Sequence, residues 1–131
     1  MRAAEAPMPA KATIANQGSM SQFVGPFDVS STLTDEVHHV RFSHLWNAIS
    51  TRHTDTVDTK FFVDGRGVIV GLAHTALVRF AAAAGRNLTD REASYVAAEY
   101  LRSRLQEEDQ RSLYHLSADE VVSLIRKLGI A

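Results

Sequence analysis

The chain of 131 residues contains no cysteine, which excludes disulfide bonds, thiolate zinc sites and cysteine nucleophiles. The absence of cysteine suits a reducing compartment, and we expect a cytoplasmic protein. Long apolar runs are also missing, since none approaches the roughly 20 residues that a membrane-spanning helix needs. The first residues hold no apolar stretch that would mark a secretory signal, so we expect no membrane partner.

An excess of charge of one sign is missing as well. The chain has 14 basic and 15 acidic residues, which gives a formal net charge of −1. Proteins that bind nucleic acid through phosphates usually carry a basic patch, so a nucleic-acid partner is not favoured. Motifs for a phosphate loop or a nucleophilic serine are also absent. We therefore expect no cofactor and no catalytic residues, and we favour a non-enzymatic protein.

The composition divides the chain into two parts. Residues 1–30 mix Ala, Pro, Ser, Gln and Gly without periodicity, which predicts a disordered leader. Within this leader, Phe23–Val29 is more apolar and could form an irregular edge strand, because Pro26 prevents central pairing. Residues 31–131 are predicted to form a single small α+β domain.

The strongest local signal is the stretch TKFFVDGRGVIVGL, Thr59–Leu72, which predicts a β-hairpin around an Asp-Gly-Arg-Gly turn. The loop could be two residues long or four, and both registers keep the same residues on each face. One face carries Phe61, Val63, Val68 and Val70, and the other carries Phe62 and Ile69. Two strands cannot bury apolar residues on both faces, so each face needs a cover.

Helical periodicity predicts the remaining elements. The spacing of Phe42, Leu45, Trp46 and Ile49 predicts a first helix over Thr34–Thr51. The segment Val37–Phe42 also alternates like a strand and could instead be a third strand beside the hairpin. These readings predict an α+β fold in which a hairpin or small three-stranded antiparallel sheet packs against about four helices.

Two capping boxes mark the clearest helix starts. Thr89 with Glu92 opens a helix that should run to about Gln110, and Ser117 with Glu120 opens the last one. An earlier helix should end at Gly85, a residue suited to the left-handed backbone of a helix end.

The order of these features resembles a small bacterial family of unknown function, whose members have a hairpin followed by helices. The matching residues are Val63-Asp64-Gly65, Val68, Ala76-Leu77, Phe80 and the helix from Thr89. The resemblance implies a bacterial source and supports the fold, and it carries no activity.

A candidate metal site lies in the polar link before the hairpin. His53, Asp55 and Asp58 could gather around an ion, since loops bring nearby oxygens and an imidazole together. On the predicted first helix, His38, His39 and His44 lack the spacing of three or four residues that helical ligands need. This site would suit a small metal-dependent enzyme, which is one alternative function.

Protein–protein contact is the function that the sequence favours, and we expect a homodimer. The second face of the hairpin and the predicted first helix supply the interface candidates, which are Phe62, Ile69, Trp46 and Arg66. A second alternative is a nucleic-acid-associated regulator. Its basic residues would be Arg102, Arg104, Arg126 and Lys127.

Overall fold

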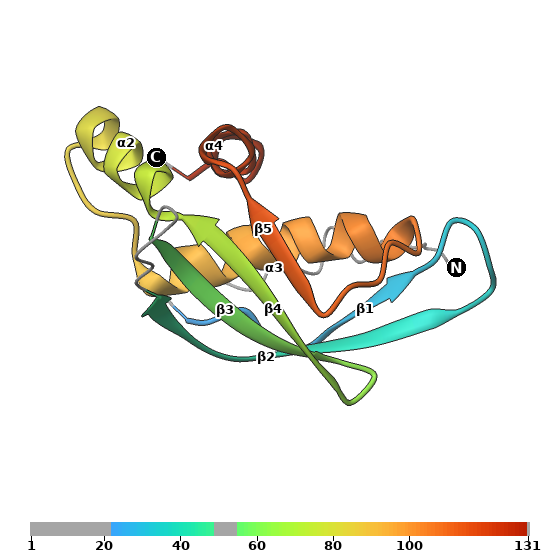
Figure 1. Cartoon of the computed structure of the whole chain (residues 1–131). Coiled ribbons are helices and arrows are strands. Elements are labelled where there is room, and N and C mark those ends of the chain that lie inside the picture. Colours follow the sequence, from blue (N-terminus) through green and yellow to red (C-terminus); the bar gives the residue numbers. More distant parts are fainter. Residues whose placement is uncertain (1–21, 49–54, 131) are drawn as a thin grey trace.

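The computed structural model of the chain describes residues 22–48 and 55–130. Five strands form one sheet in the order β1-β2-β3-β4-β5, in which β5 pairs with β4 in parallel and the other neighbours are antiparallel. Figure 1 shows the sheet curled around helix α3, with the described helices on its concave side. The elements are β1 (Phe27–Ser30), β2 (Val37–Ala48), β3 (Thr56–Val63), β4 (Arg66–Ala73), α2 (His74–Ala84), α3 (Asp90–Gln106), β5 (Leu113–Leu116) and α4 (Ala118–Lys127).

The prediction of a hairpin or three-stranded antiparallel sheet with about four helices is wrong. The sheet is five-stranded and mixed, and the described residues contain three helices. Two short strands account for part of the difference. β1 begins directly after Pro26, inside the predicted leader, whose residues 1–21 lie outside the described part. β5 occupies a segment that carries little strand signal of its own, and it forms because β4 offers a free edge.

The predicted first helix over Thr34–Thr51 is also wrong, because most of it is the long strand β2. A β-bulge between Phe42 and His44 inserts one extra residue into the pairing with β3. Phe42 and Leu45 therefore face the same side of the sheet although they are three residues apart. That spacing imitates a helical stripe, and the alternative reading of Val37–Phe42 as a strand is the correct one.

The hairpin between β3 and β4 has the shorter of the two predicted loops. Val63 pairs with Arg66 across Asp64 and Gly65, whose φ angles of 52° and 82° are the positive values that a tight type I′ turn requires. The side chains of one face are at most 1% exposed and pack on the concave side, as predicted: Phe61, Val63, Val68 and Val70.

The helix starts agree with the sequence. Thr89 with Glu92 and Ser117 with Glu120 form complete capping boxes, and Gly85 ends α2 in the left-handed region with φ 74°. Helix α3 ends at Gln106 rather than near Gln110. In the part of the chain that the structure describes, no helix combines the length and the apolar character needed to cross a bilayer.

Candidate functional site

The outer side of the curled sheet, here called the convex face, has no helix of the described residues packed on it (Figure 1). Strand register places one row of side chains from each strand on this face. Its apolar members are Val37 and Leu113, which are 46% and 58% exposed, together with half-buried Trp46, Phe62 and Ile69. Asp28, Arg41, Asp58 and Lys60 are its charged members.

Long side chains of the convex face lie flat across its apolar groups. The Arg41 guanidinium carbon is 4.4 Å from the centre of the Phe62 ring, and the Lys60 ammonium nitrogen is 5.3 Å from it. Two glycines of β4 make room for this arrangement. A Cβ atom at Gly67 would lie 3.3 Å from Lys60 Cε, and one at Gly71 would lie 3.0 Å from the Asp58 carboxylate. The convex face is therefore low in relief.

The structure brings three of the four predicted interface residues to this face. Phe62 and Ile69 lie on adjacent strands, and Trp46 lies on β2 beside the His44 ring, with ring centres 5.2 Å apart. Arg66 lies apart from them, opposite Val63 at the hairpin turn. Its guanidinium donates to the Gln110 side chain at 3.0 Å, which ties the turn to the segment before β5.

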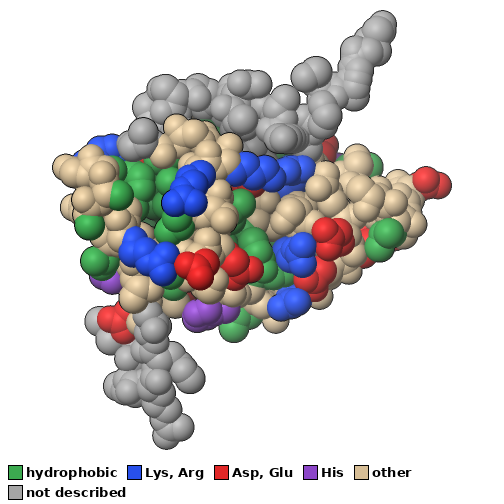
Figure 2. All heavy atoms as spheres, turned by 90° about the horizontal axis from the view of Figure 1, so that it is seen from above, with side chains coloured by type: hydrophobic (Ala, Val, Ile, Leu, Met, Phe, Trp, Pro, Cys, Tyr) green, Lys and Arg blue, Asp and Glu red, His purple; other side chains and the backbone are tan. Residues whose placement is uncertain are grey.

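Most of the basic residues predicted to contact nucleic acid are paired with carboxylates. Arg102 and Lys127 both bind Glu99 of α3, which is 1% exposed. Arg104 lies near Glu107 at 3.2 Å and near Asp109 at 3.5 Å. Figure 2, which views the helix side, shows Lys and Arg interspersed with Asp and Glu rather than gathered in a patch. The described residues of this surface therefore offer no continuous row of free cations for phosphates.

The residues of the predicted metal site serve different contacts. His53 lies outside the described residues. The Asp55 carbonyl accepts the backbone N–H of His74 at 2.9 Å. The Asp58 carboxylate accepts the Thr56 hydroxyl at 2.7 Å on the convex face.

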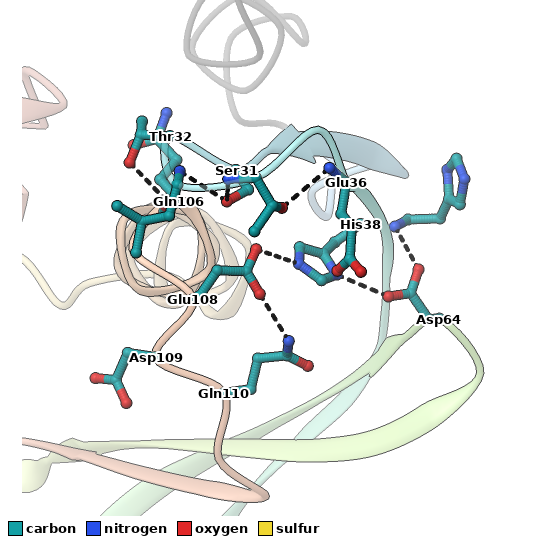
Figure 3. Close-up of polar contacts among 12 residues, drawn as sticks. Ser31, Thr32, Glu36, His38, Asp64, Gln106, Glu108, Asp109 and Gln110 are labelled. Carbon is teal, nitrogen blue, oxygen red and sulfur yellow. Dashed lines mark hydrogen bonds and ion pairs between the residues drawn. The ribbon is translucent and has the colours of Figure 1, made fainter.

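A different acidic and imidazole group, here called the His38 cluster, lies at the other end of β2 and consists of Glu36, His38, Asp64 and Glu108 (Figure 3). His38 Nδ1 is 2.8 Å from Asp64 Oδ2, and Nε2 is 3.0 Å from Glu108 Oε2. The His38 side chain is 4% exposed. The cluster therefore joins the start of β2, the hairpin turn and the chain that follows α3.

Both carboxylates that contact His38 are held by further hydrogen bonds. Asp64 Oδ1 accepts the backbone N–H of His39 at 2.8 Å, and Glu108 Oε1 accepts the Gln110 amide at 2.9 Å. Glu108 has a φ of 57°, a left-handed conformation that is unusual for Glu. These contacts fix the positions of both carboxylates before anything else binds.

The ring and the carboxylates shift each other's protonation. Burial lowers the pKa of His38, but the hydrogen bonds that the ring donates to the carboxylates of Asp64 and Glu108 outweigh burial and raise the pKa above its ordinary value. The pKa of Asp64 is lowered, first by the His39 backbone N–H and then by His38. Hydrogen bonds from His38 and Ser31 lower the pKa of Glu108. The cluster thus favours a charged imidazolium between two carboxylates.

Helical spacing of the histidines does not identify the His38 cluster, because His38 lies on a strand. On a strand, His38 and His39 point to opposite faces, so His38 is buried and His39 is exposed. The alternation of His38, Val40 and Phe42 was the signal that could have identified the buried histidine. Its partners, Asp64 and Glu108, are 26 and 70 residues away in sequence, and local patterns do not connect them.

No protein-family model, curated protein or solved structure matches the chain.

Proposed function

We propose that this chain is a non-enzymatic cytoplasmic protein that acts through protein–protein contact, and that a second copy docks on the convex face. The observation that carries the proposal is the set of apolar side chains on that face over which no helix of the described residues packs. Val37 and Leu113 are about half exposed, and Trp46, Phe62 and Ile69 are half-buried. Apolar groups that share one open sheet face commonly mark an interaction surface.

The charges of the convex face favour a second copy over other partners. The face carries Asp28 and Asp58 against Arg41 and Lys60, so its formal charge sums to zero. A nucleic acid would require a net positive face. A twofold axis between Asp58 and Lys60 would instead place each beside the other residue of the partner copy, because both project from β3 on the same side. The face is complementary to itself.

The first experiment measures solution mass by light scattering over a range of protein concentrations. We expect the unmodified protein to be a dimer and Ile69→Lys to be a monomer, because the new ammonium would be buried in the contact. Val78→Lys is the matched control, since Val78 is 56% exposed on α2, away from the convex face. This control should remain a dimer. An unmodified protein that stays monomeric at high concentration would refute the proposal.

A charge exchange tests the twofold arrangement. Lys60→Asp alone would place like charges together across the axis and should weaken the dimer about 10-fold or more. The double variant Asp58→Lys/Lys60→Asp restores opposite charges and should recover most of the affinity. If the double variant is weaker than both single variants, the two residues do not face each other in the dimer.

A further inference from the structure

We propose that Glu36, His38 and Glu108 form a binding site for one divalent transition-metal ion, and that Asp64 orients the His38 ring. This site is independent of the convex face and of the residues that the sequence indicated for metal binding. One potential ligand atom from each of the three residues lies within 4.8 Å of the others. The Glu36 and Glu108 carboxylates come to the ring from two segments that are far apart in the sequence, one just before β2 and the other after α3.

The orientation of His38 fits a metal ligand. When Asp64 accepts a hydrogen bond from Nδ1–H, the other nitrogen, Nε2, is left to carry either a proton or a metal ion. A carboxylate that holds the far nitrogen of a ligating histidine is the usual outer partner in metal sites, because it fixes the ring and raises its basicity. Binding would exchange the Nε2 proton for the ion and release that proton to solvent.

The distances also fit. His38 Nε2 and Glu108 Oε2 are 3.0 Å apart. Two ligand atoms that each lie about 2.1 Å from an ion are separated by about 3.0 Å at the right angle of an octahedral site and by about 3.4 Å at the tetrahedral angle, so a small movement of the Glu108 carboxylate would admit Zn²⁺. Glu36 is exposed, so its side chain has room to move inward and complete the set. One imidazole and two carboxylates favour an ion such as Zn²⁺ or Mn²⁺ over Ca²⁺, which prefers oxygen ligands alone.

Charge supplies an independent argument. The His38 cluster sets three carboxylates beside one imidazole, and no Lys or Arg of the described residues is among its hydrogen-bonding or ion-pair partners. The neighbouring pair of His39 and Asp28 differs from the His38 cluster in burial and in the number of carboxylates. Both of those side chains are more than half exposed, and a single carboxylate faces the ring. Among the histidines that the structure describes, only His38 combines a buried ring with more than one carboxylate partner.

The test is a titration of the EDTA-dialysed protein with Zn²⁺ in competition with a chromogenic chelator. We expect one equivalent to bind, and Glu36→Gln to weaken binding 10-fold or more. Because Glu36 has no part in the hydrogen bonds to His38, this variant should fold normally. His38→Gln should remove binding, and Asp64→Asn should weaken it 10- to 100-fold, since Asn also tolerates the positive φ of the turn.

Two controls make the titration specific. Asp35→Asn changes an exposed carboxylate next to Glu36, and His39→Gln removes the exposed neighbouring imidazole. Both should bind Zn²⁺ within about 2-fold of the unmodified protein, and Mg²⁺ and Ca²⁺ should compete poorly. The proposal is overturned if Glu36→Gln binds as tightly as the unmodified protein. It is equally overturned if no Zn²⁺ binds, or if His39→Gln causes the loss.

Discussion

The concave and convex faces of the hairpin are built from alternate residues of the same two strands, yet they have different environments. Phe61 on the concave face is fully buried and packs edge-on against Phe42, with the two ring centres 5.4 Å apart. Phe62, the next residue, is half-buried and covered by the side chains of Arg41 and Lys60. Phe61 and Phe62 are equally hydrophobic, yet they are buried to different extents. The position of α3 decides which face becomes the core and which remains available for contact.

The largest expected effect compares these two phenylalanines. Phe61→Ala should destabilise the fold by about 3 to 5 kcal/mol, because it leaves a cavity in the core. Phe62→Ala should cost about 1 kcal/mol or less when measured at concentrations where the chain is monomeric. Urea unfolding of both variants provides the comparison. Equal losses would mean that the convex face is already covered within a single chain.

The next largest effect concerns Glu99, a buried carboxylate of α3 on the concave side of the sheet. Burial would raise the pKa of Glu99, but the hydrogen bonds from Arg102 and Lys127 outweigh it and hold the pKa below its ordinary value. Glu99→Gln should cost about 3 kcal/mol at pH 7, because it leaves the buried Arg102 guanidinium without its carboxylate.

The same residue predicts a pH dependence. Since the folded pKa is the lower one, the unfolded chain binds the proton first as pH falls. The contribution of Glu99 is complete above its ordinary pKa of about 4.3 and is lost as pH falls through the folded value. We expect the difference in free energy of unfolding between the unmodified protein and Glu99→Gln to become smaller as pH is lowered from 7 to 3. A difference that stays constant or becomes larger in acid would contradict a lowered pKa of Glu99 in the folded protein.

The helix caps on the concave side should have smaller effects. Thr89 and Ser117 each accept a backbone N–H at the start of their helix, at 3.0 and 3.2 Å. Replacing either with Ala should cost about 1 kcal/mol in thermal or urea unfolding. Ser123→Ala is the control, because Ser123 is exposed within α4 and caps nothing. A similar loss at Ser123 would show that the hydroxyl contacts at the caps are not the cause.

The smallest effect should come from the cover of the convex face. Arg41→Gln removes the guanidinium above Phe62 and should cost about 0.5 kcal/mol, the value of an exposed cation–π contact. His44→Gln, on the same strand and face, is a suitable control. A loss above about 2 kcal/mol at Arg41 would mean that this side chain closes a core rather than resting on an open surface.

The parts of the fold that could be predicted depend on local chemistry. The turn at Asp64 and Gly65 and the capping boxes at Thr89 and Ser117 follow from residues within a few positions of each other. Strand β5 could not be predicted this way, since its parallel partner β4 lies about 40 residues earlier. The bulge after Phe42 gives β2 an apolar spacing of three residues, which is typical of a helix.

The candidate sites divide in the same way. Phe62 and Ile69 could be assigned to one face from the alternation of side chains in the hairpin. Trp46 lies on the same face because β2 is a strand rather than the predicted helix. The His38 cluster depends on contacts that β2 makes with the hairpin turn and with the chain after α3. Such contacts exist only once the sheet has curled around the helix.

Trp46 allows the most direct test of the central claim, because it is the single tryptophan of the chain and lies on the convex face. Its fluorescence can be quenched with acrylamide at a series of protein concentrations, with mass measured on the same samples. We predict that the quenching constant falls as the mass doubles, because the second copy shields the ring from the quencher. Doubling of the mass with unchanged quenching, or a monomer at every concentration, would contradict the account.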